Sequence, residues 1–277
     1  MFLDAPTPAS FPLLGRRDAD VHDPARWVFN RLAADYLRRP DYPPALVERL
    51  LELAGQAGEA GAAVAELGAG VGHLALPLAR LGARVAAVEP AQDMLAALRS
   101  RTQLGQDEAV TLVHAAAEQT GLPPAAFGLV LLADALQWVD PEQTGREAAR
   151  ILAPEGCLAI VEARFADTPF MQGLAALITE SNPKARPRPA GRARQLLTLA
   201  ADPPWTAERF TQEALLSGPD LDAVLRSFST VGPALGPTRL EGLLSRAREL
   251  AEQCGGGRFQ RELTLTWARR RRASRPA

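Results

Sequence analysis

The chain has 277 residues, 47% of them hydrophobic, which is enough for one large α/β domain with a substantial core or for two small domains. Its 31 basic and 32 acidic side chains give a formal net charge of −1 at pH 7. No overall field therefore draws the protein toward nucleic acid or a membrane surface.

Neither the two cysteines nor the first residues of the chain carry a recognisable metal-site or targeting pattern. Cys157 and Cys254 are far apart and match no metal-ligand spacing, so we predict no metal site and a reduced setting. Residues 1–14 mix proline, aspartate and serine with apolar residues and lack the basic and apolar blocks of a signal peptide. No apolar stretch reaches the roughly 18 uncharged residues that a membrane span needs. We expect a cytoplasmic protein, without membrane contact.

The first part of the chain predicts an arm and two helices. Residues 1–25 are rich in proline and aspartate and predict an irregular arm. Apolar residues recur at helical spacing over residues 24–37 and again over residues 45–55. Three prolines within residues 39–44 end the first helix, because proline cannot supply the helix hydrogen bonds.

From residue 62 onward, short apolar runs alternate with helical stretches. The runs predict strands over residues 62–67, 84–88, 110–114, 127–133 and 157–161. Helices are predicted over residues 72–81, 91–101 and 141–152. Repeated βα units with strands apolar on both faces predict a doubly wound α/β fold, a parallel sheet covered by helices.

The last third of the chain is less regular. Residues 171–179 look helical, and residues 183–189 are basic and proline-rich, which leaves open a mobile lid or a solvated loop. A strand over 210–216, helices over 221–228 and 238–252, and a strand over 259–267 follow. Four arginines at positions 269–272 are interpreted as a solvated end.

A glycine turn follows the first predicted strand, with Gly68, Gly70 and Gly72 spaced two residues apart. Such a tight turn between strand and helix needs glycine, for positive φ and for close approach of a ligand. It lies at the carboxyl edge of the strands, where doubly wound folds bind ligands. The dinucleotide fingerprint has its third glycine one place later, where this chain has His73.

Two acids flank this turn. Glu66 precedes the first glycine, and Glu89 ends the second predicted strand. A carboxylate beside the turn favours a ligand with a cationic amine over a pyrophosphate. A carboxylate at the end of the second strand can accept hydrogen bonds from both hydroxyls of a ribose. S-adenosylmethionine fits this description better than NAD does.

Ordered motifs over residues 62–163 resemble the class I S-adenosylmethionine-dependent methyltransferases. They are VAELGAGVG at 64–72, VEP at 88–90 with DML at 93–95, AE at 117–118 with LP at 122–123, FGLV at 127–130, ADALQWVD at 133–140 and ARILAPEG at 149–156. The chain is most similar to the small-molecule branch that includes trans-aconitate and ubiquinone-biosynthesis methyltransferases. The resemblance implies a seven-stranded, mostly parallel sheet with the last strand antiparallel. It also implies transfer of a methyl group to an O, N or C atom of a small molecule, by a monomer or homodimer.

The resemblance divides the chain into four segments. Residues 1–55 would form an arm and helices that cap the cofactor site, and residues 56–164 the S-adenosylmethionine-binding core. Residues 165–206 would be a helical, proline-rich lid or insertion. Residues 207–277 would complete the sheet with C-terminal strands and helices.

The resemblance also implies site residues. Glu66 and the backbone of the first two glycines would face the methionine part, Glu89 would hold the ribose, and the backbone of Ala117 would contact the adenine. The full predicted cofactor set is Tyr36, Arg39, Glu66, Gly68, Ala69, Gly70, Gly72, Glu89, Pro90, Met94, Ala116, Ala117, Glu118 and Ala133.

Four members of this set carry a further expectation. Met94 would pack near the adenine or ribose. Tyr36 and Arg39 on the arm would either close over the cofactor or pack on the surface. Many relatives have a polar side chain at the position of Ala116, so this chain departs from the pattern that binds the adenine amine.

The residues that would act on the substrate are less well defined. Asp134 and Gln137, just past the fourth strand, are the candidate catalytic residues, although relatives often have histidine at the second position. Trp138 is a candidate wall of the substrate pocket or a core residue. His73 and His114 are interpreted as structural residues, so no general base is identified.

Three other functions stay open. Enzymes that methylate a nucleobase amine carry an Asn/Asp-Pro-Pro-aromatic run after the fourth strand, whereas residues 133–136 read ADAL. The near-neutral charge also argues against nucleic acid. A nicotinamide oxidoreductase is disfavoured by His73. A methyltransferase that acts on protein is grouped with the nucleic-acid enzymes. A methyltransferase-fold protein that binds but does not transfer can be separated only by binding and activity assays.

Overall fold

The computed structural model describes residues 26–55, 62–103, 109–184, 191–201 and 203–270. The predicted arm over residues 1–25, most of the proline-rich segment and the last two of the four arginines lie outside the described residues. The expectation of a lid at the proline-rich segment therefore stays a prediction.

One seven-stranded sheet in the order β3-β2-β1-β4-β5-β7-β6 forms the centre of the molecule. Its strands are β1 (Ala63–Leu67), β2 (Arg84–Val88), β3 (Val110–Val113), β4 (Phe127–Ala133), β5 (Leu152–Phe165), β6 (Thr206–Leu216) and β7 (Gly257–Arg269). The pairs among β1 to β5 are parallel, and β7 is antiparallel to both of its neighbours. The doubly wound fold with an antiparallel last strand is thus confirmed.

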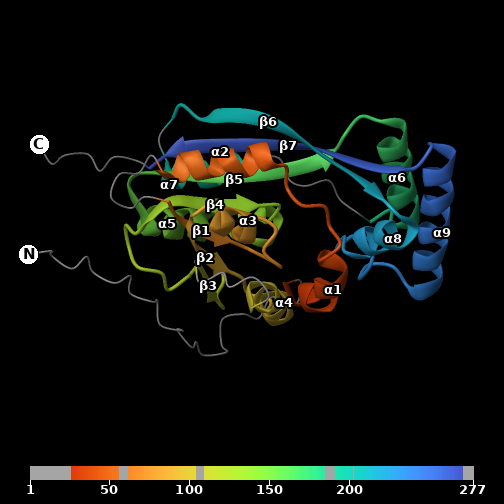
Figure 1. The fold of residues 1–277 in the computed structure, drawn as a ribbon, viewed down its shortest axis with the longest axis horizontal. Coiled ribbons are helices and arrows are strands. Elements are labelled where there is room, and N and C mark those ends of the chain that lie inside the picture. Colours follow the sequence, from red (N-terminus) through yellow and green to blue (C-terminus); the bar gives the residue numbers. More distant parts are fainter. Residues whose placement is uncertain (1–25, 56–61, 104–108, 185–190, 202, 271–277) are drawn as a thin grey trace, which may run out of the picture.

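Helices cover both faces of this sheet (Figure 1). In chain order they are η1 (Arg26–Leu32), α1 (Ala33–Tyr36), α2 (Pro44–Gly55), α3 (Ala75–Arg80), α4 (Gln92–Gln103), η3 (Leu136–Trp138), α5 (Pro141–Ile151), α6 (Pro169–Ser181), α7 (Arg192–Ala200), α8 (Gly218–Arg226) and α9 (Pro237–Gln253). Side chains of α2 and α3 share one apolar core with alternate strand residues, and those of α5 and α7 share a second core with the intervening residues. This alternation is the pattern of a sheet buried on both faces.

Three helices, α6, α8 and α9, form a separate helical lobe with its own apolar core. Figure 1 shows the lobe at one end of the molecule, beyond the ends of the short strands and at the tips of the long strands β5, β6 and β7. The predicted strand over residues 157–161 is too short, because β7 pairs with β5 from Cys157 to Phe165. Because these strands are long, the helical lobe at their ends lies near the carboxyl ends of β1 and β4.

Several predicted boundaries are corrected. The first predicted helix is a 3-10 segment, η1, followed by the short α1, and the helix after the glycine turn begins at Ala75 rather than at residue 72. The second shift arises because Gly72 has a φ of +86°, which no right-handed helix accepts. Helix α7 was not predicted; its buried Leu196, Leu197 and Ala200 pack in the core shared with α5.

Candidate functional site

The glycine turn joins β1 to the helix α3 and opens on a cavity. A Cβ at Gly72 would lie 2.3 Å from Leu98 Cδ1, so this glycine allows α4 to pack against the turn. At Gly70, φ is +56°, and the nearest atom to a Cβ placed on this residue would be Tyr36 Cε1 at 3.9 Å. Gly70 therefore presents its backbone to open space, as a ligand-binding turn requires.

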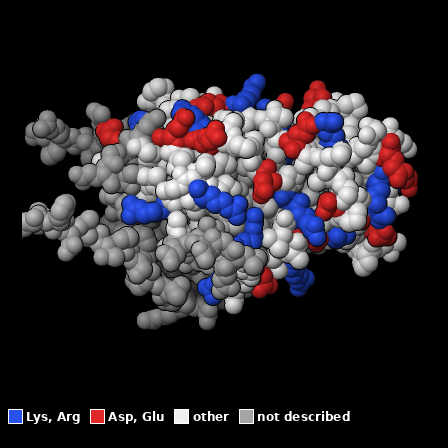
Figure 2. Space-filling view, viewed as in Figure 1, with Lys and Arg blue, Asp and Glu red and all other residues white. Residues whose placement is uncertain are grey.

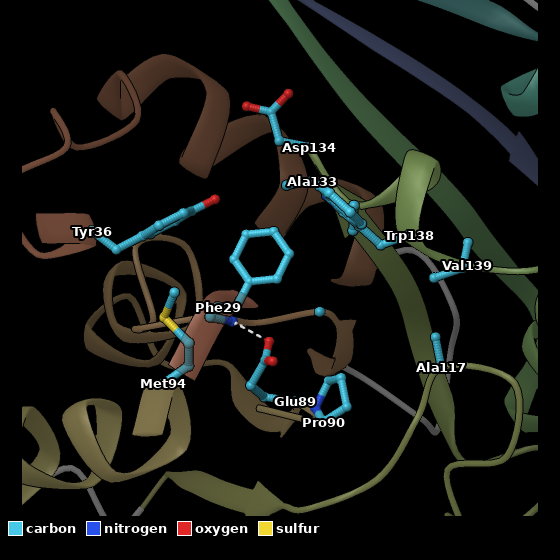
Figure 3. A pocket seen from close by; sticks show the side chains of 13 residues that line it. Phe29, Tyr36, Glu89, Pro90, Met94, Ala117, Ala133, Asp134, Trp138 and Val139 are labelled. Carbon is cyan, nitrogen blue, oxygen red and sulfur yellow. Dashed lines mark hydrogen bonds between the residues drawn. The ribbon is translucent and has the colours of Figure 1, made fainter. Parts of the chain in front are cut away.

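Glu89 follows β2, and its side chain is hydrogen-bonded to the glycine turn. Its Oε2 accepts a hydrogen bond from the backbone N–H of Gly70 at 2.8 Å, and its Oε1 accepts one from Ala91 at 2.8 Å. The side chain is buried, and burial raises its pKa to about 7. Figure 3 shows this carboxylate beneath the ring of Phe29 at the floor of the cavity, with the bond to Gly70 dashed.

Glu66 is the second buried acid of the site. One side of its carboxylate bonds to the backbone of Ala75 at the start of α3, and burial raises its pKa to about 8. Its Oε2 has no hydrogen-bond partner among the described residues. Because a buried carboxylate oxygen without a partner is costly, this atom indicates a place for a donor or cation from a ligand.

The cavity above Glu89, here called the turn cavity, has a volume of about 80 Å³. It is lined by Phe29, Tyr36, Gly68, Gly70, Glu89, Pro90, Met94, Ala117, Ala133, Asp134, Ala135, Trp138 and Val139. In Figure 3 the Phe29 ring lies between Tyr36 and Trp138. Phe29 meets Trp138 edge to face, with ring centroids 4.9 Å apart.

A second space, the deep pocket, also adjoins the glycine turn. It is lined by Tyr36, Arg39, Pro40, Tyr42, Glu66, Gly68, Ala69, Gly70, His73, Ala133 and Arg261. Gly68, Gly70, Tyr36 and Ala133 belong to the walls of both the deep pocket and the turn cavity. The two spaces therefore meet around the turn.

A third space, the lobe cavity, lies between the sheet and the helical lobe and measures about 530 Å³. It is lined by Phe29, Tyr36, Arg39, Asp134, Gln137, Trp138, Ala163, Arg164, Phe165, Ala175, Ile178, Thr179, Phe228, Ser229, Thr230 and Arg261. It shares Phe29, Tyr36, Asp134 and Trp138 with the turn cavity. These four residues mark where a ligand in one space would meet a ligand in the other.

Arg39 stands between the deep pocket and the lobe cavity. Its Nε and Nη2 donate to the side chain and carbonyl oxygens of Ser227, at 2.8 and 3.0 Å, and its Nη1 donates to the hydroxyl of Tyr36 at 2.9 Å. Its guanidinium carbon lies 3.8 Å from the Tyr36 ring centroid. Burial lowers the pKa of Arg39, and no carboxylate among the described residues pairs with it.

Asp134 is held in a buried network. Its Oδ2 accepts from Arg261 Nη1 at 3.0 Å, and its Oδ1 accepts from the backbone of Ala163 at 3.2 Å. Arg261 also donates to Gln212, whose amide nitrogen donates to the carbonyls of residues 40 and 41. With its φ of +51°, Asp134 ends β4 in a sharp turn that directs the carboxylate toward β7.

Most of the residues predicted for the cofactor come together around the turn. Eleven of the predicted set line the turn cavity or the deep pocket: Tyr36, Arg39, Glu66, Gly68, Ala69, Gly70, Glu89, Pro90, Met94, Ala117 and Ala133. Gly72, Ala116 and Glu118 line none of the three spaces. Glu118 instead accepts a hydrogen bond from the backbone of Asp140, where α5 begins.

The residues predicted to act on the substrate lie at the lobe cavity. Asp134, Gln137 and Trp138 all line it, and the Gln137 amide donates to the Asp134 carbonyl at 2.8 Å. His73 bonds to Asp41 and to the carbonyl of Tyr36, in keeping with a structural role.

His114 is bonded through Nε2 to the carbonyl of Pro90 at 3.0 Å. It lines none of the three spaces, whereas His73 lines the deep pocket, and the structural interpretation of both histidines stays a prediction.

Sequence reasoning missed Phe29, Tyr42, Arg261 and the walls supplied by the helical lobe. Phe29 lies in a segment expected to be an ordinary amphipathic helix, where an aromatic residue predicts only burial. Arg261 is a buried charged residue of β7, and it bonds to Asp134. Nothing in the sequence around this arginine indicates that it lies at the site. The residues of the helical lobe are brought to the site by the pairing of β5 with β7, two strands that are far apart in the sequence.

Two features are absent from the described residues. None of their helices has the length and apolar character needed to cross a membrane. Within the same residues, no three His, Cys, Asp or Glu side chains gather as a metal site would require.

The chain is similar to known methyltransferases in sequence and in fold. The profile described as "Methyltransferase domain" matches residues 65–160. Uncharacterised methyltransferases of Mycobacterium tuberculosis and Mycobacterium bovis are 37% identical over 123 residues, which is 44% of this chain. That match spans about half of those proteins, 46% of their length.

A longer match relates the chain to the malonyl-[acyl-carrier protein] O-methyltransferase of Geobacter sulfurreducens, with 30% identity over 250 residues, covering 83% of this chain and 91% of that protein. Among solved structures, one from Anaeromyxobacter dehalogenans, provisionally described as a type II methyltransferase, superposes with a TM-score of 0.59. The two chains are 23% identical, and the superposition covers 84% of this chain and 97% of the other, so the comparison shows that they share the fold. The chain belongs to the methyltransferase family.

Proposed function

We propose that this protein transfers the methyl group of S-adenosylmethionine to a small molecule held in the lobe cavity. The observation that carries the proposal is the pair of buried acids, Glu66 and Glu89, on either side of a glycine turn that opens on two joined spaces. The family membership of the chain supports the same reaction type.

The residues present fit this cofactor. The unpartnered Oε2 of Glu66 suits the ammonium of its amino-acid end, and Arg39, which has no ion pair among the described residues, suits the carboxylate. The Glu89 carboxylate suits the ribose hydroxyls, with Pro90 and Met94 as walls for the adenine side. A pyrophosphate, by contrast, would lie beside two acids and be repelled.

When bound, this cofactor supplies a methyl group on a positively charged sulfur. The chain's own contribution is to orient and desolvate the two reactants. Phe29, Tyr36, Asp134 and Trp138, which line both the turn cavity and the lobe cavity, are proposed to surround the point of transfer. The aromatic rings among them exclude water from that point.

The acceptor is proposed to be a small molecule. The Geobacter sulfurreducens relative is named as an O-methyltransferase, which supports an oxygen acceptor. Figure 2 shows acidic and basic side chains interspersed on one face of the described residues, a distribution that does not favour a polyanion there. A cytoplasmic location, the state of association and the exclusion of nucleic acid stay predictions.

Calorimetric titration with S-adenosylhomocysteine and, separately, with NADH tests the proposal. We expect S-adenosylhomocysteine to bind with one site per chain and NADH not to bind. Binding of NADH in place of S-adenosylhomocysteine would overturn the proposal. If S-adenosylhomocysteine binds but no methyl transfer to small acids, phenols, alcohols or amines is detected, the chain is a binding protein with this fold.

A further inference from the structure

We propose that Glu147 and Arg150 of α5 are positioning residues for the adenine of the cofactor, because they hold the loop that forms one wall of the turn cavity. Neither residue lines any of the three spaces, so both act through that loop. The inference rests on the proposed function, since it concerns how the turn cavity holds the adenine side of S-adenosylmethionine.

The loop between β3 and β4, residues 114–126, brings Ala117 to the wall of the turn cavity. Figure 3 shows Ala117 on the side of the cavity opposite Met94. Residues 115–117 are three alanines, whose side chains offer no hydrogen-bonding group to the polar edge of a base. Within this segment only the backbone can recognise the base, so recognition depends on where that backbone is held.

The loop has no strand or helix of its own to hold it, because residues 114–126 form only turns, bends and irregular backbone. His114 bonds to the carbonyl of Pro90, and Glu118 accepts a bond from the backbone of Asp140. Both of these bonds lie at the exposed surface, where water competes for the same groups and the net contribution is small. The buried contacts of the loop come later, at residues 120–122.

Thr120 and Leu122 are bonded to α5 in a closed ring of four residues. The backbone N–H and the Oγ1 of Thr120 both donate to Oε1 of Glu147, at 2.8 and 2.5 Å. The N–H of Leu122 donates to Thr120 Oγ1 at 3.1 Å. Arg150 completes the ring: its Nη2 donates to the Leu122 carbonyl and to Glu147 Oε1, at 2.8 Å each, and its Nε donates to Glu147 Oε2 at 2.7 Å.

The carboxylate at the centre of this ring is ionised and almost fully buried. Burial by itself favours the neutral acid, but the donors from Arg150 and Thr120 hold the pKa of Glu147 below its usual range. An apolar side chain of similar size would pack in this place at no greater cost than a buried charge. What the charge adds is direction, because each donor of the loop has to point at it.

Helix α5 is a rigid frame for two parts of the cavity wall. Ala148 and Ile151 anchor the helix in the same apolar core that contains Ala117 and Val139. Val139 lines the turn cavity and stands two residues before the first residue of α5. Because one helix fixes both walls, loosening the loop should affect the base and leave the rest of the cofactor in place.

The test compares S-adenosylhomocysteine with S-ribosylhomocysteine, which has the ribose and the amino-acid end but no base. Calorimetry measures the first ligand directly, and competition against it measures the second. We expect Glu147→Gln to weaken S-adenosylhomocysteine binding by about 5- to 30-fold and to leave S-ribosylhomocysteine within about 2-fold of the wild type, because only the base meets the loop.

Equal losses for the two ligands would mean a general distortion of the site and overturn the inference. Unchanged affinity for S-adenosylhomocysteine overturns it as well. Failure of the wild type to bind S-adenosylhomocysteine overturns the proposed function instead.

The matched control lies on the same helix. Glu142→Gln breaks an exposed pair with Arg146 and should change neither affinity. A loss in this control as large as that in Glu147→Gln would show that any change of charge on α5 weakens the site, and would contradict the specific role of the ring.

A second pair of variants changes the ring without removing a charge. Thr120→Val keeps the shape of the side chain but removes the hydroxyl that joins Leu122 to Glu147. We expect it to weaken S-adenosylhomocysteine binding by about 3- to 10-fold, whereas Thr120→Ser, which keeps the hydroxyl, should stay within about 2-fold of the wild type. This pair carries the test if Glu147→Gln does not fold, and equal affinities in the two variants overturn the inference.

Hydrogen exchange followed by mass spectrometry gives an independent readout. Peptides that cover residues 114–122 should exchange faster in Glu147→Gln and in Thr120→Val, while peptides from β1 and β4 keep their wild-type rates. Wild-type exchange of the loop in both variants contradicts the claim that the ring holds it.

Discussion

Arg261 of β7 donates a hydrogen bond to Asp134 at the end of β4 over 3.0 Å, and both side chains are almost fully buried. The two residues are 127 positions apart in the chain. Their contact fastens the antiparallel part of the sheet to the carboxyl edge of its parallel part, where the three spaces meet.

Loss of Arg261 should therefore destabilise the protein strongly. We expect Arg261→Gln to lower the free energy of unfolding by about 3–5 kcal/mol, because it leaves the Asp134 carboxylate buried without its counter-charge. The matched control is Arg164→Gln, whose exposed pair with Glu262 should contribute less than about 1 kcal/mol. Urea denaturation of both variants measures the difference, and similar losses would contradict the assignment.

The charge of Glu66 should matter for cofactor binding. Glu66→Gln keeps the shape of the side chain but removes the proposed partner of the ammonium. We expect affinity for S-adenosylhomocysteine to fall by about 1.5–3 kcal/mol, the usual contribution of a hydrogen bond to a charged group. Calorimetry in two buffers of different ionisation enthalpy should also show proton release near pH 7 in the wild type and less in the variant. Unchanged affinity would show that the ammonium lies elsewhere.

Stability should fall as the pH rises from about 5 to 8 on account of the two buried acids. Burial raises the pKa of Glu66 to about 8 and that of Glu89 to about 7, from a usual value of 4.5. The folded protein thus binds more protons than the unfolded chain across this window, so the contribution is complete below about pH 4.5 and is lost as pH rises through the folded pKa values.

Thermal melts of the wild type and of Glu66→Gln at several pH values isolate this effect. The wild type should lose more Tm than the variant between pH 5 and pH 8. Parallel curves would mean that Glu66 does not titrate in this range.

Glu89 should be more important for the cofactor than Glu118, although the sequence nominates both. We expect Glu89→Ala to lower S-adenosylhomocysteine affinity by about 1–3 kcal/mol, because the ribose hydroxyls lose a charged acceptor. Glu118→Ala should have little effect, since Glu118 bonds to the backbone of Asp140 away from the cavities. Equal losses of S-adenosylhomocysteine affinity in the two variants would show that Glu118 also contributes to the cofactor site.

The sequence predicts the parallel half of the fold well, because each strand there is a short apolar run and each helix carries its own periodicity. Glu66 and Glu89 are found for the same reason: Glu66 lies in β1 and Glu89 follows β2, in a motif whose spacing is local. The Glu89 carboxylate accepts a bond from Gly70 of the turn, and that of Glu66 bonds to the backbone of Ala75 at the start of α3. Local pattern is sufficient for this part of the site.

The lobe cavity could not be predicted in this way. Phe165 and Arg261 reach it through the pairing of β5 with β7, which joins residues about 100 positions apart, and Phe228 reaches it from the segment after α8. Helix α7 was missed because the proline-rich segment before it suggested that irregular structure continues. The unusual φ of Asp134 is imposed by its contacts with Ala163 and Arg261, which only the tertiary structure supplies.

The bond from Arg39 to Ser227 ties a segment near the start of the described chain to one near its end. During synthesis on the ribosome, residues 62–165 emerge with all five parallel strands before Ser227 has been translated. At that stage the nascent protein holds Glu66 and Glu89 but has not yet fixed Arg39 through Ser227, so the proposed contact of Arg39 with the cofactor carboxylate would have to wait until the last helices and strand are made. A fragment ending before Ser227 is accordingly expected to fold its parallel strands without gaining full affinity.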